Sequence, residues 1–467
     1  MPFFITMNKT TQIFLLVGLI LFSLTAVVFF VNPRIPVGAS FLMLILFAVF
    51  VLAFFNTDCA LVLLVFSMLL SPELKAGVLS SRTIIIRIED ILLIIVFFGW
   101  LAKVALNKEL GLLRITPLNI PIYFYLFFCL VSSLWAVFNE RLELKNSIFY
   151  LLKYLEYYLL FFMVSNNLTE RRKIKLFVFF ILIVGLVVGI YGWIQIPTGQ
   201  RVSTPFEGEE GEPNTLAGYL ILMLGLITGF FIHFARLRIL LGIFWVILFV
   251  PFLYTLSRGG WVAFFPMVLA ILFFTRRIKL PLFAFLLFAT FIVFSAPSVL
   301  PTRVQSRIQE TFSPGKKYQF FGREIILDES ASERIETWKK GMDKFMQRPI
   351  LGHGVPDAAV IDNQYIRVLR ECGIFGFIAF LWLLVKLLAL GYRNYRLNPD
   401  DDFVQALSLG FLAGFIGLLF HAFSAATFII IRIMEPFWFL AALLVAAAEP
   451  NPEKNEDEDS SYQPLSA

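Results

Sequence analysis

The chain has 467 residues, of which 59% are hydrophobic and only 15% are charged, whereas about a quarter of the residues in soluble domains are charged. This composition excludes an ordinary soluble domain and indicates an integral membrane protein. The three cysteines, Cys59, Cys129 and Cys372, show no CxxC or Cys/His spacing, so the sequence predicts neither a disulfide framework nor a structural zinc site. The net charge of +6 comes from basic residues scattered between apolar segments, a pattern that does not indicate nucleic-acid binding.

Apolar segments follow one another along most of the chain. A segment of about 20 apolar residues can cross the hydrocarbon core, where it must be helical to satisfy its own backbone groups. This rule predicts about fourteen spans, of which the third, fourth and tenth are short: 11–31, 37–55, 59–71, 91–106, 118–137, 147–165, 174–196, 215–234, 239–256, 260–275, 280–296, 372–391, 403–422 and 426–447. We therefore expect an all-α fold, a polytopic transmembrane helical bundle of about 12–14 spans.

Lysines and arginines in the short loops predict the orientation of this bundle, because positively charged loops stay in the cytoplasm. With the N-terminus inside, the inner short loops hold 16 of these residues and the outer ones 8. Both termini are therefore predicted to be cytoplasmic. No small-residue cleavage site follows the first apolar run, so we expect a retained helix there.

One polar connection is much longer than the others and is predicted to be extracytoplasmic (periplasmic). Within it, from Ser332 onwards, Ile335, Trp338, Met342 and Phe345 recur at helical spacing, which predicts an amphipathic helix. The predicted organisation is eleven spans in 1–296, the large loop in 297–361, three spans in 362–448, and a disordered acidic cytoplasmic tail in 449–467.

The predicted topology gathers Arg201, Arg258, Arg334 and Asp362 on the outer face. Arg258 follows an apolar run, where an ionised side chain is costly unless it is paired or hydrated. It either extends to a lipid headgroup or binds phosphate, for which the guanidinium fork is well suited. The acidic loop 207–213 is either a solvated turn or a cation site, and Asn214 after it either caps a helix or also contacts a substrate.

Asp362 and Gly373 are eleven residues apart, which places them on one face of a continuous helix. Asp362 either caps that helix or acts as a general base beside the arginines. Asn363, Tyr365 and His353 lie nearby in the sequence and are candidates for supporting positions.

Charged residues also occur inside predicted spans, at Lys153 and Glu156, at Arg432 and Glu435, and at Arg367, Arg370 and Glu371. Pairing at helical spacing would neutralise these charges; proton relays or charges along a substrate pathway are the alternative. The sequence contains no P-loop, HExxH or nucleophile-elbow motif, which argues against the common ATPases, zinc proteases and serine hydrolases.

Four stretches together resemble the O-antigen ligase and polymerase family of polytopic bacterial envelope proteins: Arg201 to Tyr219, Ser257 to Val262, Ser332 to Gly354 and Asp362 to Gly376. The resemblance implies transfer of a glycan from an undecaprenyl-pyrophosphate carrier at the outer face of the bacterial cytoplasmic (inner) membrane. The family's Arg-x3-Leu motif falls on Arg258, with Val262 in place of Leu. Its His-x10-Gly motif falls on Asp362 and Gly373, so that Asp stands where the family has His.

We therefore expect a metal-independent membrane glycosyltransferase, either an O-antigen or exopolysaccharide polymerase or a ligase, with no cofactor and no nucleic-acid partner. Its expected partners are the lipid-linked glycan donor, a glycan or lipid acceptor, membrane lipids and a polysaccharide chain-length regulator. The expected catalytic residues are Asp362 and Arg258, the pyrophosphate ligands Arg201, Arg258 and Arg334, and the supporting residues Asn214, Asn363, Tyr365, Gly373 and His353. The alternative is a secondary transporter or exporter of envelope precursors, although the two halves show no internal repeat.

Overall fold

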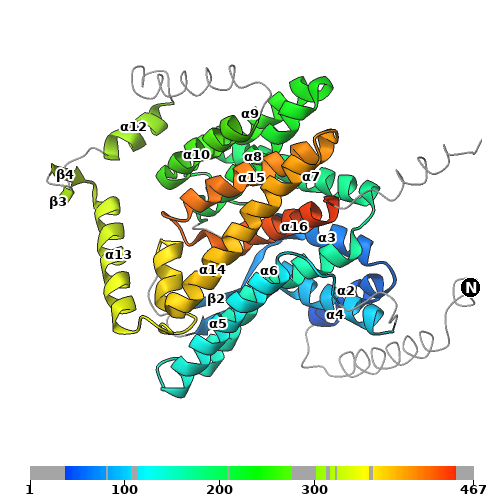
Figure 1. Cartoon of the computed structure of the whole chain (residues 1–467), viewed down its shortest axis with the longest axis horizontal. Helices are drawn as coiled ribbons and strands as arrows, with labels where there is room; N and C mark the ends of the chain where they lie inside the picture. The colour runs from blue at the N-terminus through cyan, green and yellow to red at the C-terminus, as the bar shows by residue number, and fades with distance from the viewer. Residues whose placement is uncertain are drawn as a thin grey trace, which may run out of the picture.

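The computed structural model describes residues 37–79, 82–106, 113–207, 211–275, 301–311, 316–320, 323–356 and 361–448. Most of these residues form α-helices (Figure 1): α2 (Val37–Phe55), α3 (Thr57–Leu70), α4 (Ile88–Leu106), α5 (Asn119–Phe138), α6 (Leu144–Asn167), α7 (Arg171–Gln195), α8 (Pro213–His233), α9 (Arg238–Tyr254), α10 (Arg258–Phe274), α12 (Thr302–Thr311), α13 (Glu329–Gln347), α14 (Gln364–Leu397), α15 (Asp402–His421) and α16 (Ile431–Ala447). Short 3-10 turns are η3 (Ile196–Thr198), η4 (Ala235–Leu237) and η6 (Thr427–Ile429).

The helices confirm the predicted fold class. Each predicted span within the described residues corresponds to one helix. The ends agree within about five residues except for the span 372–391, where α14 is longer at both ends. The predicted spans 11–31 and 280–296 and the tail 449–467 lie outside the described residues. By length and apolar composition, seven helical segments within the described residues could cross a membrane: Asn119–Phe138, Leu144–Asn167, Arg171–Thr198, Pro213–His233, Ala235–Tyr254, Gln364–Leu397 and Asp402–His421. The protein is therefore a multi-pass helical membrane protein.

Two short antiparallel hairpins were not predicted. The first pairs β1 (Glu73–Leu79) with β2 (Arg82–Arg87), and the second pairs β3 (Lys316–Phe320) with β4 (Arg323–Leu327). The run of isoleucines in 84–86 favours a strand because β-branched residues pack well on a pleated surface. Strands of this length are much shorter than the run of about 20 apolar residues that indicates a membrane-spanning helix.

The centre of the bundle is formed by α8 and α15, which pack along their length. Glycines repeat at a spacing of four in both helices, at Gly225 and Gly229 in α8 and at Gly410 and Gly414 in α15. A Cβ atom at Gly225 would lie 2.6 Å from the backbone nitrogen of Gly414, so the two backbones approach too closely for larger residues. This close contact makes the pair a rigid base for the loops at its ends.

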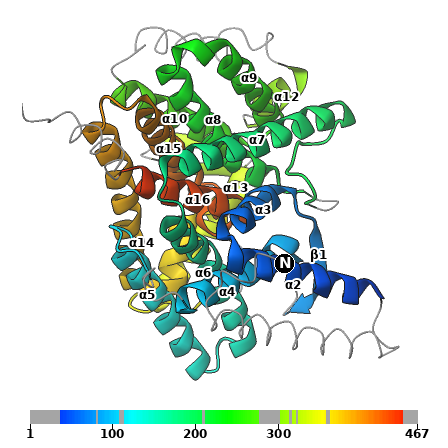
Figure 2. The same ribbon diagram turned by 90° about the vertical axis from the view of Figure 1, so that its right-hand side faces the viewer.

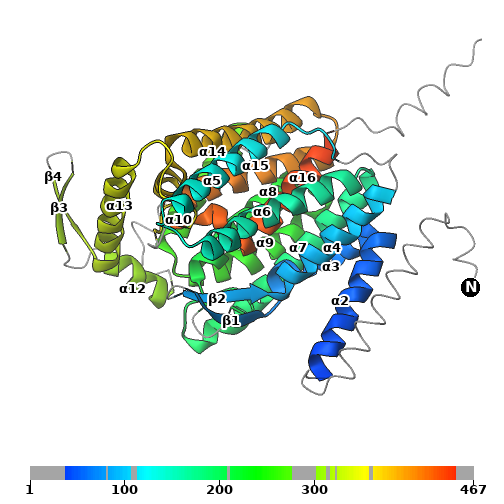
Figure 3. The same ribbon diagram turned by 90° about the horizontal axis from the view of Figure 1, so that it is seen from below.

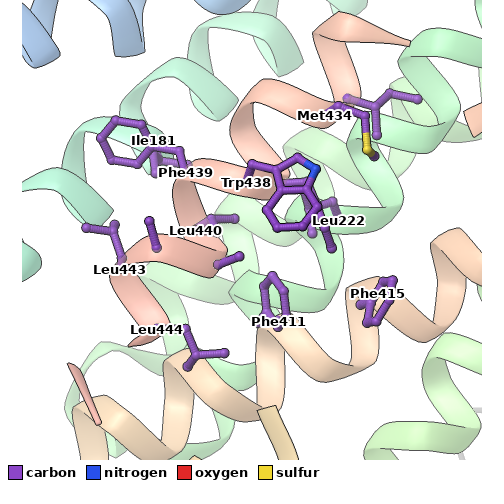
Figure 4. Packing of buried hydrophobic residues seen from close by; sticks show 14 of the residues in the cluster. Ile181, Leu222, Phe411, Phe415, Met434, Trp438, Phe439, Leu440, Leu443 and Leu444 are labelled. Carbon is purple, nitrogen blue, oxygen red and sulfur yellow. The ribbon is translucent and has the colours of Figure 1, made fainter. Parts of the chain in front are cut away.

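Beside this pair, α16 fills the core with aromatic side chains. Figure 4 shows the buried cluster that α16 forms with α7, α8 and α15, which includes Ile181, Leu222, Phe411, Phe415, Trp438 and Phe439. In Figures 1 and 2, α15 and α16 run between a group containing α9 and α10 and a second group containing α2, α4 and α6.

Helix α14 is broken at Gly373, and a loop docks into the break. Gly373 has φ of 66°, and the loop 349–354 bonds to the exposed backbone through His353 N to Arg370 O (2.9 Å) and Ile374 N to Pro349 O (2.8 Å). A Cβ atom at Gly373 would overlap the Ile350 carbonyl oxygen. The prediction that Asp362 and Gly373 share one face of a continuous helix is therefore wrong, because α14 begins only at Gln364 and is interrupted at Gly373.

The elements between α10 and α14 gather at one end of the bundle. Figures 1 and 3 show α12, the β3–β4 hairpin and α13 together beside the N-terminal end of α14. Helix α13 contains the amphipathic helix predicted from Ser332 and packs on α14, where Gly341 leaves room for Ile366.

Candidate functional site

Four arginines from four separate segments come close enough to interact electrostatically. They are Arg201 in the loop before α8, Arg258 at the start of α10, Arg307 in α12 and Arg334 in α13. We call this set the arginine cluster. The fold thus brings together the three arginines that the sequence predicted as pyrophosphate ligands and adds Arg307.

The position of Arg258 is fixed by hydrogen bonds at the start of α10. The Ser257 hydroxyl accepts from Gly260 N (3.2 Å) as the N-cap and donates to Asn214 Oδ1 (2.8 Å). Asn214 lies in the first turn of α8, so it ties the starts of two helices together, while Glu212 is the N-cap residue of α8. The Arg258 guanidinium donates to the Asp328 carboxylate (2.6 Å).

Arg201 is held beside this turn by main-chain contacts. Its Nε donates to Thr255 O (2.9 Å), and Val202 N donates to Tyr254 O (3.1 Å). Desolvation, together with the positive charges of Arg307, Arg334 and Arg258, lowers the pKa of Arg201 to about 10. The shift indicates a site where positive charge is in excess and where an anion would be stabilised.

Arg334 is surrounded by charges of both signs. Desolvation lowers its pKa; the carboxylates of Asp362 and Asp328 oppose this effect, and the charges of Arg258 and Arg307 add to it. Asp362 therefore lies within electrostatic reach of the arginine cluster, as the sequence predicted.

Asp362 is exposed and does not cap α14. The N-cap is Asn363, whose Oδ1 accepts from Tyr365 N (3.0 Å) and Ile366 N (3.1 Å). Asn363 Nδ2 donates to Phe423 O (3.2 Å) and Tyr365 Oη donates to Leu419 O (2.7 Å), so both residues attach the start of α14 to the end of α15. The prediction that Asp362 caps α14 is wrong, because Asn363 is the N-cap. The Asp362 carboxylate is therefore accessible.

His353 and Gly373 lie at the break in α14. The His353 Nε2 atom is 2.8 Å from the carbonyl oxygen of Lys344, near the end of α13. Their contacts in the described part of the chain join α13 to α14 and do not reach the arginine cluster. Both residues therefore position elements around the site.

Sequence reasoning missed three residues near the cluster: Arg307, Asp328 and His421. Asp328 caps α13, and an Asp before an amphipathic run is a recognisable signal. His421 is fully buried at the end of α15, with Nδ1 2.8 Å from Thr427 Oγ1, and it interacts electrostatically with Arg334. Only the fold brings His421 and Arg307 to this place.

The acidic loop shows no sign of a metal site in its described part. Glu207 Oε2 accepts from Glu212 N (2.9 Å), and residues 208–210 of this loop lie outside the described residues. Across the described ranges, no group of three or more His, Cys, Asp or Glu side chains is placed to hold a metal ion.

A second set of charges lies inside the bundle and is called here the interior cluster: Glu73, Arg87, Glu89, Asp90, Lys153, Glu156, Arg432 and Glu435. Lys153 pairs with Asp90 and lies 3.6 Å from Glu156, which agrees with the pairing predicted for these residues. Arg432 instead binds carbonyl oxygens of Leu69 (3.1 Å) and Pro205 (2.6 Å) and lies 3.6 Å from Glu73.

Comparison with known families agrees with this geometry. Residues 243–381 match the model of the O-antigen ligase family, over less than half of the chain. This segment is similar to the O-antigen ligase family. The matched segment contains Arg258, Arg307, Asp328, Arg334 and Asp362, whereas Arg201 lies outside it. No curated protein matches the chain. The match confirms the predicted resemblance and supports a membrane glycan transferase of the O-antigen ligase and polymerase type.

Proposed function

We propose that the protein transfers a glycan from an undecaprenyl-pyrophosphate carrier to a hydroxyl group of a glycan or lipid acceptor at the extracytoplasmic face of the cytoplasmic membrane. The observation that carries the proposal is the arginine cluster. Four guanidinium groups converge there, and Asp328 and Asp362 are the carboxylates that act on Arg334. A pyrophosphate is the kind of ligand that an excess of guanidinium groups recognises.

In this reaction the acceptor oxygen attacks the anomeric carbon while the bond from that carbon to the phosphate oxygen breaks. Negative charge develops on the departing pyrophosphate, and Arg201, Arg258 and Arg334 would stabilise it by fixed electrostatic contacts. Asp362, exposed and within reach of Arg334, would accept the proton of the acceptor hydroxyl. The chain's own residues thus supply charge stabilisation and a base.

The remaining predicted residues position the helices that carry the site. Asn214 orients the start of α10, Asn363 and Tyr365 hold the start of α14, and Gly373 and His353 join α13 to α14. The region 297–361 would cover the site from outside, with both termini in the cytoplasm. A polysaccharide chain-length regulator remains a proposed partner.

The test is complementation of a deletion in the host with wild type, Arg258→Gln or Asp362→Asn at matched membrane abundance. Arg172→Gln is the control, since it makes the same chemical change at an exposed arginine of α7. We expect Arg258→Gln to lower glycan transfer by about 100-fold or more, as for loss of one transition-state contact. Asp362→Asn should also fail to complement, and Arg172→Gln should complement fully.

The products that accumulate distinguish the two forms of the reaction. Single carrier-linked units indicate a polymerase, and full-length chains left on the carrier indicate a ligase. A glycan profile unchanged by the deletion, in a host without a redundant homologue, contradicts the proposal and favours transport of envelope precursors. Full complementation by Arg258→Gln contradicts the proposed site.

A further inference from the structure

Asp328 makes two contacts with one carboxylate. Its Oδ1 accepts from Ala331 N (3.2 Å) as the N-cap of α13, and its Oδ2 accepts from Arg258 Nη1 (2.6 Å). Both partners of this ion pair are largely buried, with side-chain exposures of 15% for Arg258 and 12% for Asp328. A charge-assisted bond of this length, shielded from water, is stronger than an exposed surface pair.

The ion pair connects two parts of the arginine cluster. Arg258 begins α10 of the bundle, whereas Asp328 begins α13, which also carries Arg334 less than two turns further along. The docking of α13 through Asp328 therefore sets how far Arg334 lies from Arg258. Figure 3 shows α13 at the edge of the bundle.

The other end of α13 has anchors of its own. Gly341 packs against Ile366 of α14, and the Lys344 carbonyl lies 2.8 Å from His353 Nε2. If the bond between Asp328 and Arg258 opens, the start of α13 is released while its end stays attached to α14. The Asp328–Arg258 pair, called here the latch, therefore holds the start of α13, and the contacts with Ile366 and His353 hold its end.

We propose that Asp328 competes with pyrophosphate for Arg258: its carboxylate holds the start of α13 against α10 when no donor is bound, and the pyrophosphate of the donor displaces it. The inference rests on the proposed function and adds a regulation of the same site. The exchange is favourable because a pyrophosphate carries several negative charges and can bind more than one guanidinium at once, whereas Asp328 carries one charge.

Three variants separate charge from capping. Asp328→Asn removes the charge but keeps an oxygen that caps α13, since Asn is as good an N-cap as Asp. Asp328→Ala removes both. Asp343→Asn is the matched control, because it makes the same change at an exposed residue of the same helix.

The measurement is the affinity of the purified full-length protein for inorganic pyrophosphate. We expect Asp328→Asn and Asp328→Ala to bind it about three- to tenfold more tightly than wild type, the effect of losing one partly buried ion-pair competitor. Asp343→Asn should bind as wild type does. Unchanged or weaker binding by Asp328→Asn overturns the proposal, because Asp328 would then orient Arg258 rather than compete for it.

Amide hydrogen exchange in the first turn of α13 provides the second readout. Pyrophosphate should speed exchange there in wild type and have little effect in Asp328→Asn, whose latch is already weakened. Exchange slowed by pyrophosphate in wild type contradicts displacement. If wild type and Arg258→Gln bind pyrophosphate equally, the phosphate site of the proposed function fails; if binding depends on Arg258 but not on the charge of Asp328, only the latch fails.

Discussion

The arginine cluster and the interior cluster contain the same kinds of charged groups but differ in how the charges are compensated. In the interior cluster, Arg432 is fully buried and is surrounded by carbonyl oxygens and the Glu73 carboxylate. In the arginine cluster, four guanidinium groups lie within electrostatic reach of one another, and desolvation together with their repulsion lowers the pKa of Arg201. Compensated charge holds a structure together, whereas excess charge at an accessible place is suited to a ligand of opposite sign.

The two clusters are joined through one loop. Arg432 binds the carbonyl oxygens of Pro205 (2.6 Å) and Phe206 (3.5 Å), a few residues after Arg201. The same guanidinium binds Leu69 O and Ser71 O at the end of α3. The interior cluster therefore fixes the loop that carries one member of the arginine cluster.

The largest expected effect is that of Arg432→Ala. The change leaves the buried carbonyl oxygens of Leu69 and Pro205 without this guanidinium and leaves Glu73 with Arg87 alone, which we expect to cost roughly 3–5 kcal/mol of folding stability. Arg432→Lys should recover little of this loss, since one ammonium group cannot match the planar fork. The measurement is the thermal midpoint in detergent. Arg201→Gln is the comparison and should keep a near wild-type midpoint, because losing Arg201 relieves repulsion among the arginines; equal losses in the two variants would break the distinction between the clusters.

A smaller loss is expected for Lys153→Met. This variant leaves the buried Asp90 carboxylate without its cation, which should lower stability by roughly 3 kcal/mol. Adding Asp90→Asn removes the stranded charge, so the double variant should regain about half of the loss. Thermal midpoints of the two single variants and the double variant provide the cycle. A double variant no more stable than Lys153→Met would show that the pair does not act as a compensated unit.

The next effect concerns the support of Arg258. Ser257→Ala removes the N-cap of α10 and the bond to Asn214, and should cost about 1 kcal/mol of stability. Asn214→Ala removes only the second contact and should cost less. Both should lower glycan transfer, Ser257→Ala by about tenfold, because a misplaced guanidinium stabilises the leaving group poorly. Wild-type transfer by Ser257→Ala at equal abundance would show that Arg258 needs no such support.

Much of the fold follows from the sequence, because length and apolar composition determine a membrane helix. The helices α2–α10 and α14–α16 match the predicted spans within the described ranges, whereas both hairpins were too short for that rule. At the site, Arg201, Arg258, Arg334 and Asp362 were placed on one face from loop charges, and the structure brings them within electrostatic reach of one another. Their roles remain proposals.

The parts that the sequence did not reveal depend on packing over long sequence separations. Arg307 and His421 reach the cluster only because the fold brings α12 and the end of α15 to this place. The pairing expected between Arg432 and Glu435 was replaced by carbonyl contacts from two loops, since a guanidinium satisfies several acceptors at once. The break at Gly373 depends on a loop that docks from outside α14.

The smallest expected effect is a pH dependence of anion binding. The pKa of Arg201 is lowered to about 10 by desolvation and by Arg307, Arg334 and Arg258, so Arg201 is charged at neutral pH and loses its proton as the pH rises through about 10. Pyrophosphate affinity should therefore fall several-fold between about pH 9 and pH 11, and bound pyrophosphate should raise the pKa again.

Loss of the Arg201 proton weakens pyrophosphate binding, but in the protein without pyrophosphate it increases folding stability. Because the folded pKa lies below the ordinary value of an arginine, the unfolded chain holds this proton more tightly. Desolvation and the neighbouring arginines therefore oppose folding below about pH 10, and the penalty is relieved above it. Pyrophosphate should relieve the same repulsion at neutral pH, and the thermal midpoint should rise more at about pH 7 than at about pH 11. Arg201→Gln is the control for the affinity measurement, because any change in the protonation of pyrophosphate itself affects wild type and variant equally. If Arg201→Gln shows the same fall in affinity, the repulsion is not centred on Arg201, and the excess charge that separates the two clusters must be assigned to the other three arginines.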